Sequence, residues 1–123
     1  MQWLAVAVGG ALGSLARFAA ARGAYQLLGT AFPWGTLAVN VAGALAIGFS
    51  YVWLVERDAH GPDWRAFIMV GVLGGFTTFS SFSLETLLLV QQGAALRAAV
   101  NVGTSVMVCL LATAFGIWVG RVL

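Results

Sequence analysis

The stretch GGFTTFSSFS, residues 74–83, decides the fold, because it places five hydroxyls and three phenyl rings where a hydrophobic chain should be most apolar. Each glycine costs about 1 kcal/mol in a helix interior. The β-branched Thr77 and Thr78 add strain directly after Gly74 and Gly75. These residues predict a break in a helix. Inside a membrane a break frees carbonyls that need a partner, which is either a bound cation held by oxygen ligands or serine hydroxyls filling a simple kink.

The residues after the expected break alternate aromatic and hydroxyl side chains. Phe79 and Phe82 lie three residues apart, and Ser80 and Ser83 repeat the same spacing beside them. Phenyl rings have electropositive edges, and hydroxyls are hydrogen-bond donors. Such a surface can replace water around an anion. The simpler interpretation is a phenylalanine stripe that packs on lipid or on neighbouring helices.

The composition is that of an integral membrane protein. Of the 123 residues, 61% are hydrophobic and 8% are charged, whereas a soluble domain carries about a quarter charged residues. We therefore expect one membrane domain over residues 1–123. All the basic residues are arginines and none form a run, which argues against nucleic-acid binding. Cys109 is the only cysteine, so neither an intrachain disulfide nor a zinc cluster is expected.

Four stretches have the roughly 20 apolar residues that a membrane span needs, and we predict spans at 3–27, 34–54, 65–90 and 97–120. The N-terminal residues lack the basic region of a cleaved signal peptide and are expected to begin a retained first span. Indole rings favour the headgroup level of a bilayer. All five tryptophans fall at proposed span ends: Trp3, Trp34, Trp53, Trp64 and Trp118.

Small residues recur at the spacing of helix contacts. GGALG places Gly9 four residues before Gly13, and GIWVG does the same with Gly116 and Gly120. Pairs of this kind let two membrane helices approach closely. They predict that the first span and the fourth span each pack closely against a neighbouring helix. They carry no functional information.

The arginines give no preferred orientation in the membrane. With four spans, both termini and the second loop share one side, and two loops share the other. The first side carries Arg57, Arg65 and Arg121, and the second is nearest to Arg17, Arg22 and Arg97. Since topology follows the Lys and Arg count near span ends, a three-to-three tie leaves two explanations. The chain inserts one way on another cue, or it inserts both ways and forms an antiparallel homodimer.

Three amide or charged side chains lie well inside the predicted spans, where polar groups usually bond a partner helix or line a pathway. Asn40 provides an amide with two donors, either for an interhelical hydrogen bond or for an ion. Arg17 either extends to the interface or faces a water-filled vestibule. Glu85 is the only acidic residue deep in a span, and a lone carboxylate there suggests a proton or cation relay. It lies four residues after Ser81 on one face, which predicts a hydrogen-bonding partner that the two residues share.

Three motifs together resemble the Fluc/CrcB family of fluoride channels. They are GGALGSLARF in the first span, GTLAVNVAG in the second and GVLGGFTTFSSFS in the third, in the family's order and spacing. The resemblance covers the whole chain. It implies an all-α membrane protein with four transmembrane helices, of which the third is broken near the membrane midplane. It further implies an antiparallel, dual-topology homodimer with two pores that passes fluoride passively, excludes chloride and holds a structural sodium ion (Na⁺) at its centre.

The resemblance also assigns roles to individual residues. Main-chain carbonyls of Gly74 and Thr77, from both subunits, would bind the sodium. Ring edges of Phe79 and Phe82 would contact fluoride, and Asn40 would donate to it. The remaining candidates for the fluoride pathway are polar residues: Thr36, Ser80 and Ser81 in the wall, Glu85 near the pore, Arg17 at a vestibule, and Thr104 and Ser105 in the fourth span. Asn101 receives no role.

Two other functions remain open from the sequence. A small multidrug exporter has the same architecture but depends on a glutamate in its first span, and this chain has no acidic residue there. A non-transporting assembly subunit would use its polar residues only to join helices. An enzyme is not expected, because His60 lies in a charged loop and no nucleophile–base pattern or phosphate-binding glycine loop occurs. The expected location is a cell inner membrane or plasma membrane, surrounded by lipid.

Overall fold

The computed structural model describes all residues from Met1 to Leu123 as helices joined by short links. Four helical segments are long and apolar enough to cross a membrane: Gln2–Leu28, Trp34–Glu56, Pro62–Gln91 and Ala95–Val122. The prediction of four helices able to span a membrane is confirmed, and each helix continues up to three residues beyond the ends predicted for it. The chain is a multi-pass membrane protein.

Two of the four segments contain more than one kind of helix. The first segment is α1 (Gln2–Leu28) and the fourth is α6 (Ala95–Val122). The second consists of α2 (Trp34–Tyr51) and a π-helical stretch, η1 (Val52–Glu56). The third is composed of α3 (Pro62–Arg65), π-helical η2 (Ala66–Val72), α4 (Leu73–Phe76) and α5 (Phe79–Gln91).

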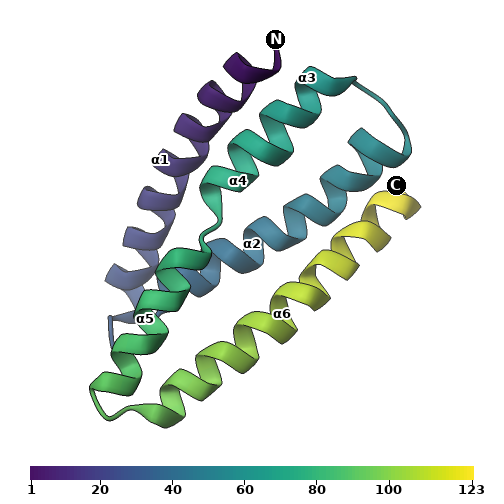
Figure 1. Cartoon of the computed structure of the whole chain (residues 1–123). Helices are drawn as coiled ribbons and strands as arrows, with labels where there is room; N and C mark the ends of the chain where they lie inside the picture. Colours follow the sequence, from purple (N-terminus) through teal and green to yellow (C-terminus); the bar gives the residue numbers. More distant parts are fainter.

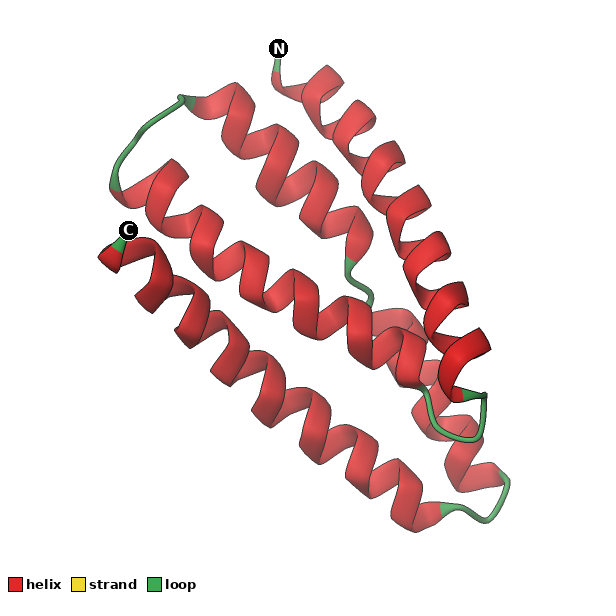
Figure 2. Ribbon diagram, turned by 180° about the vertical axis from the view of Figure 1, so that it is seen from behind, coloured by secondary structure: helices red, strands yellow, loops and turns green.

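The segments form a bundle in which α1 packs along η2 and α4, and α2 packs along α6 (Figure 1). Both chain termini and the link at residues 57–61 gather at one end, which we call the terminal end (Figure 2). There the ammonium of Met1 lies 2.7 Å from Asp63 and the guanidinium of Arg121 lies 2.5 Å from Glu56. The links at residues 29–33 and 92–94 lie at the opposite, loop end.

Glycines allow the closest helix contacts, as their spacing predicts. A Cβ atom on Gly13 would collide with the carbonyl of Val72 in η2, and one on Gly116 would collide with the carbonyl of Leu45 in α2. The backbones therefore approach at distances that no larger residue tolerates. The Gly9–Gly13 pair joins α1 to the third segment, and the Gly116–Gly120 pair joins α6 to the second.

Replacing Gly13 by alanine is expected to lower the thermal stability of the purified protein, because overpacking a tight contact costs about 1–3 kcal/mol. The measurement is the unfolding temperature in detergent. Gly10→Ala is the matched control on the same helix, since a Cβ there meets nothing within 4 Å. It should leave stability unchanged or raise it. Equal unfolding temperatures for the two variants would contradict the close contact between Gly13 and the Val72 carbonyl.

Candidate functional site

Helical bonding in the third segment is interrupted at Thr77 and Thr78, which have extended backbone conformations (φ −89°, ψ 158° and φ −150°, ψ 120°). α4 ends at Phe76 and α5 begins at Phe79, with an irregular link between them (Figure 1). The hydroxyl of Thr78 accepts a hydrogen bond from the backbone N–H of Ser81 at 3.1 Å. Thr78 is therefore the N-cap of α5, and this cap is one reason for a hydroxyl in the quoted stretch.

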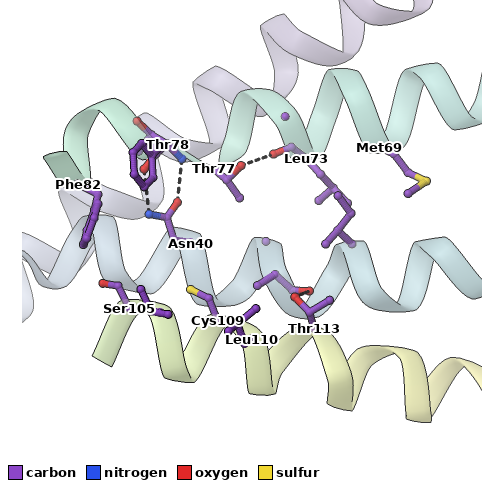
Figure 3. Close-up of a pocket in the computed structure, with 16 residues that line it drawn as sticks. Asn40, Met69, Leu73, Thr77, Thr78, Phe82, Ser105, Cys109, Leu110 and Thr113 are labelled. Atoms are coloured by element: carbon purple, nitrogen blue, oxygen red, sulfur yellow. Dashed lines mark hydrogen bonds between the residues drawn. The ribbon is translucent and has the colours of Figure 1, made fainter. Parts of the chain in front are cut away.

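Asn40 of α2 holds this link by two reciprocal bonds. Its amide Nδ2 donates to the carbonyl of Thr78 at 2.9 Å, and the N–H of Thr78 donates to its Oδ1 at 2.8 Å (Figure 3). The interhelical hydrogen bond anticipated from the sequence is thus present. Because a side-chain amide has two N–H groups, one donor of Asn40 is left over for another acceptor.

Arg17 of α1 supplies a third contact at the interruption. Its Nε donates to the carbonyl of Gly75 at 3.0 Å, so the side chain is bonded to the third segment within the bundle. Sequence reasoning foresaw free carbonyls here but did not assign an arginine to one of them. The carbonyls of Gly74 and Thr77 have no hydrogen-bond donor within the chain.

An open groove of about 480 Å³ runs beside the interruption between the second, third and fourth segments (Figure 3). We call it the central groove. Of the residues singled out from the sequence, it brings together Asn40, Gly74, Thr77, Phe79, Phe82 and Ser105. Its lining also contains Gly43, Ala44, Ile47, Met69, Leu73, Thr78, Val106, Cys109, Leu110 and Thr113, so no charged side chain faces it.

The two phenylalanines form a pair at the α5 side of the groove. Their ring centroids lie 5.4 Å apart with an interplanar angle of 41°. The ring of Phe82 is partly buried, whereas Phe79 is 79% exposed. An aromatic side chain left this open on a membrane protein is covered by lipid or by another chain, because burying it is favourable.

Polar side chains recur on α6 at intervals of four residues, and all of them except the first, Asn101, line the groove. Ser105 donates to Asn101 Oδ1 at 3.3 Å, and Asn101 donates to the hydroxyl of Thr86 at 2.8 Å. Cys109 and Thr113 continue the line along the groove. Thr104, one position from Ser105, is not among the lining residues. Only the four-residue spacing could have revealed Asn101, Cys109 and Thr113 from the sequence.

Ser80 and Ser81 lie at the start of α5 and do not line the central groove of a single chain. The hydroxyl of Ser80 is 3.2 Å from that of Thr78, so the two share a hydrogen bond. Ser81 contributes its backbone N–H to the cap described above. Both serines therefore stabilise the first turn of α5.

Glu85 lies one turn further along α5, in a cluster with Tyr25 of α1 and Thr36 of α2. The hydroxyl of Tyr25 donates to Glu85 Oε2 and that of Thr36 donates to Oε1, each at 2.7 Å. The Tyr25 and Thr36 oxygens are 3.4 Å apart. Thr36 is buried. The sequence suggested that Glu85 and Ser81 share a partner, but the carboxylate takes its donors from two other helices.

Two pockets at the loop end adjoin this cluster. The first, of about 280 Å³, contains Glu85 as its only charged side chain. The second, of about 590 Å³, contains Arg17 and Arg22. We call them the acidic pocket and the basic pocket. Tyr25 and Thr30 line both of them.

Comparison with known proteins gives one consistent result. Residues 4–117 match the protein family described as "CrcB-like protein, Camphor Resistance (CrcB)". A relative from Methylococcus capsulatus named "Fluoride-specific ion channel FluC" is 50% identical over 119 residues, or 97% of this chain, although the chain spans only 50% of that relative's length. Two relatives with the same name match over nearly their whole length. They come from Rhodospirillum rubrum (48% identity, 99% of this chain, 93% of the relative) and Magnetococcus marinus (44% identity, 100% of both).

Proposed function

Because the chain belongs to the CrcB-like protein family, we propose that it is a passive, fluoride-selective ion channel that lets cytoplasmic fluoride leave the cell. One observation carries the proposal. The central groove combines the Asn40 amide, the rings of Phe79 and Phe82 and several hydroxyls, with no charged side chain. A neutral set of donors and ring edges suits a small anion that must give up water. The relatives are named as channels, and the expectation that the chain is not an enzyme agrees with this.

Fluoride passage through such a site depends on replacing its hydration shell. The free N–H of Asn40 would donate to the ion while the bonds to Thr78 hold the amide in place. The rings of Phe79 and Phe82 would turn their positive edges toward it. The polar line on α6 (Ser105, Cys109 and Thr113), together with Thr36, Ser80 and Ser81, would continue the path on either side of the rings.

We propose that the functional unit is an antiparallel, dual-topology homodimer with two pores. The central groove is open, Phe79 is largely exposed, and only 18 of 123 residues are buried within one chain. A second copy would cover this groove and complete each pore from both subunits. In this arrangement the interruption at Thr77 and Thr78 lies near the membrane midplane, and the host membrane is a cell inner membrane or plasma membrane.

A structural sodium ion fits the two carbonyls at the interruption. The carbonyls of Gly74 and Thr77 lack donors in the chain, and neutral oxygens are suitable ligands for a hard cation. No group of three or more His, Cys, Asp or Glu side chains forms that could hold a metal ion, so main-chain oxygen is the ligand type that these residues provide. When bound, the ion would satisfy carbonyls that the interruption leaves free and join two subunits.

Replacing sodium by the bulky cation N-methylglucamine at constant ionic strength is expected to lower both the unfolding temperature and fluoride flux. A ligand at 100 times its dissociation constant stabilises a protein by about 2.7 kcal/mol. The unfolding temperature should therefore rise as sodium is titrated back, in proportion to the logarithm of its concentration once the site is mostly filled. Exchanging choline for N-methylglucamine is the control and should change nothing. A flat titration would remove the sodium from the proposal.

The direction of transport follows from the chemistry of the ion. Hydrogen fluoride crosses bilayers uncharged and dissociates in a near-neutral cytoplasm, where the anion is trapped. A passive channel releases it down its gradient. The negative-inside potential assists by about 2.3 kcal/mol per charge per 100 mV.

The test is the release of fluoride from vesicles that contain the purified protein. A fluoride-selective electrode records efflux from vesicles loaded with potassium fluoride when a potassium ionophore relieves the voltage. We expect rapid efflux of fluoride, whereas vesicles loaded with chloride retain it. Absence of fluoride efflux would favour a non-transporting subunit. Proton-dependent uptake of an aromatic cation would instead support an exporter.

A further inference from the structure

Tyr25 carries an inference that goes beyond the proposed function and rests on it. We propose that Tyr25 is a positioning residue for fluoride permeation, which holds the Glu85 carboxylate and limits the repulsion that this charge exerts on an anion. The phenol does not line the central groove. It acts through Glu85, with which it forms a 2.7 Å hydrogen bond.

The carboxylate is held on both of its oxygens. Tyr25 from α1 and Thr36 from α2 donate to different oxygens of Glu85, which lies on α5. Three segments therefore fix one side chain. Hydroxyl hydrogens pointing at a carboxylate are strong, charge-assisted donors, and their dipoles oppose the negative potential that it projects.

The location makes this charge relevant to an anion. Thr36, which donates to Glu85, lies one turn from Asn40 on the same face of α2. Since Asn40 lines the central groove, Glu85 lies next to the polar residues that continue from the groove toward the loop end. Glu85 is the only charged residue in the acidic pocket. An anion that passes between the groove and the loop end by this route passes the carboxylate.

Tyr25 also lies between the two pockets at the loop end. It lines the acidic pocket with Glu85 and the basic pocket with Arg17 and Arg22. The arginines would concentrate anions in the basic pocket, and the carboxylate would oppose their progress. Tyr25, which lines both pockets, therefore holds the carboxylate of the acidic pocket next to the arginines of the basic pocket.

The experiment measures fluoride efflux from vesicles for wild type, Tyr25→Phe, Glu85→Gln and the double variant. Sodium is held constant, and ionic strength is raised with an impermeant organic salt from about 0.01 M to about 1 M, which shortens the Debye length from about 30 Å to about 3 Å. We expect Tyr25→Phe to reduce flux about fivefold at low ionic strength, because charges close together in a partly shielded site interact strongly. High ionic strength should restore most of the fluoride flux that Tyr25→Phe loses.

Glu85→Gln removes the negative charge and keeps the shape of the side chain, so it measures the effect of the charge alone. It should conduct faster than wild type at low ionic strength, because the charge that opposes the anion is gone, and adding Tyr25→Phe to it should have no further effect at any ionic strength. Tyr51→Phe is the matched control, because Tyr51 is exposed and has no side-chain hydrogen bond. All variants are checked for wild-type unfolding temperature and oligomeric state.

The outcomes separate this inference from the proposed function. The positioning role would be overturned by a loss in Tyr25→Phe that is independent of salt and persists when Glu85→Gln has removed the charge. A Glu85→Gln variant that does not conduct, or wild-type flux in Tyr25→Phe, would overturn it as well, while wild type still conducts fluoride. A wild-type protein that does not conduct would overturn the proposed function itself.

Discussion

Phe82→Ile is expected to lower fluoride flux at least about tenfold, because a loss of about 1.4 kcal/mol of stabilisation from a desolvated ion is a factor of ten in rate. Isoleucine keeps an apolar side chain at the edge of the central groove but has no ring edge to offer an anion. Phe79→Ile should act in the same direction, since the two rings form one pair. The measurement is electrode-detected efflux from vesicles with equal amounts of protein.

Phe115→Ile is the control for this substitution. Phe115 is an exposed aromatic residue of α6 that stacks on Trp118 and does not line the central groove. It should leave flux unchanged. Wild-type flux in Phe79→Ile and in Phe82→Ile, with an intact oligomer, would reduce the ring pair to a packing contact and remove the aromatic contribution to permeation.

Asn40→Asp should have an even larger effect, with a loss of flux of at least about a hundredfold, or about 2.7 kcal/mol. The substitution changes one atom and preserves shape. It removes the donor to the Thr78 carbonyl and the remaining donor proposed for fluoride, and a charged aspartate would also repel the anion. Leaving a buried acceptor unpaired costs about 1–3 kcal/mol, so the unfolding temperature should fall as well.

Gln91→Glu makes the same chemical change at an exposed position near the end of α5 and should be silent in both assays. Efflux and thermal unfolding of the two variants are measured side by side. If Asn40→Asp lost stability but conducted fluoride normally, Asn40 would be a structural clamp on Thr78 and not part of the fluoride pathway.

Much of the fold could be predicted from the sequence because membrane spans are set by local composition. Twenty apolar residues, flanking tryptophans and short polar links are visible without knowing any partner. The glycine contacts could also be predicted, since small residues four apart need only one helix to be recognised. Which helix each pair meets depends on the whole bundle, and only the structure shows that Gly13 meets η2 and Gly116 meets α2.

The site was less predictable wherever one side chain is satisfied by another segment. The quoted stretch indicated an interruption with unpaired backbone groups, but not that Asn40 and Arg17 would bond three of them. Likewise, Glu85 was visible as a carboxylate in an apolar span, whereas Tyr25 gave no signal. Its hydroxyl reaches Glu85 from a residue 60 positions earlier in the chain, and sequence spacing carries no information about such a contact.

The reversal potential of a bilayer containing the purified protein, with fluoride on one side and an equal concentration of chloride on the other, tests the central claim most directly. If the groove of ring edges, amide and hydroxyls passes fluoride alone, the potential at zero current will move far toward the equilibrium potential of fluoride. A reversal potential near zero would mean that both halides pass equally and would contradict the account.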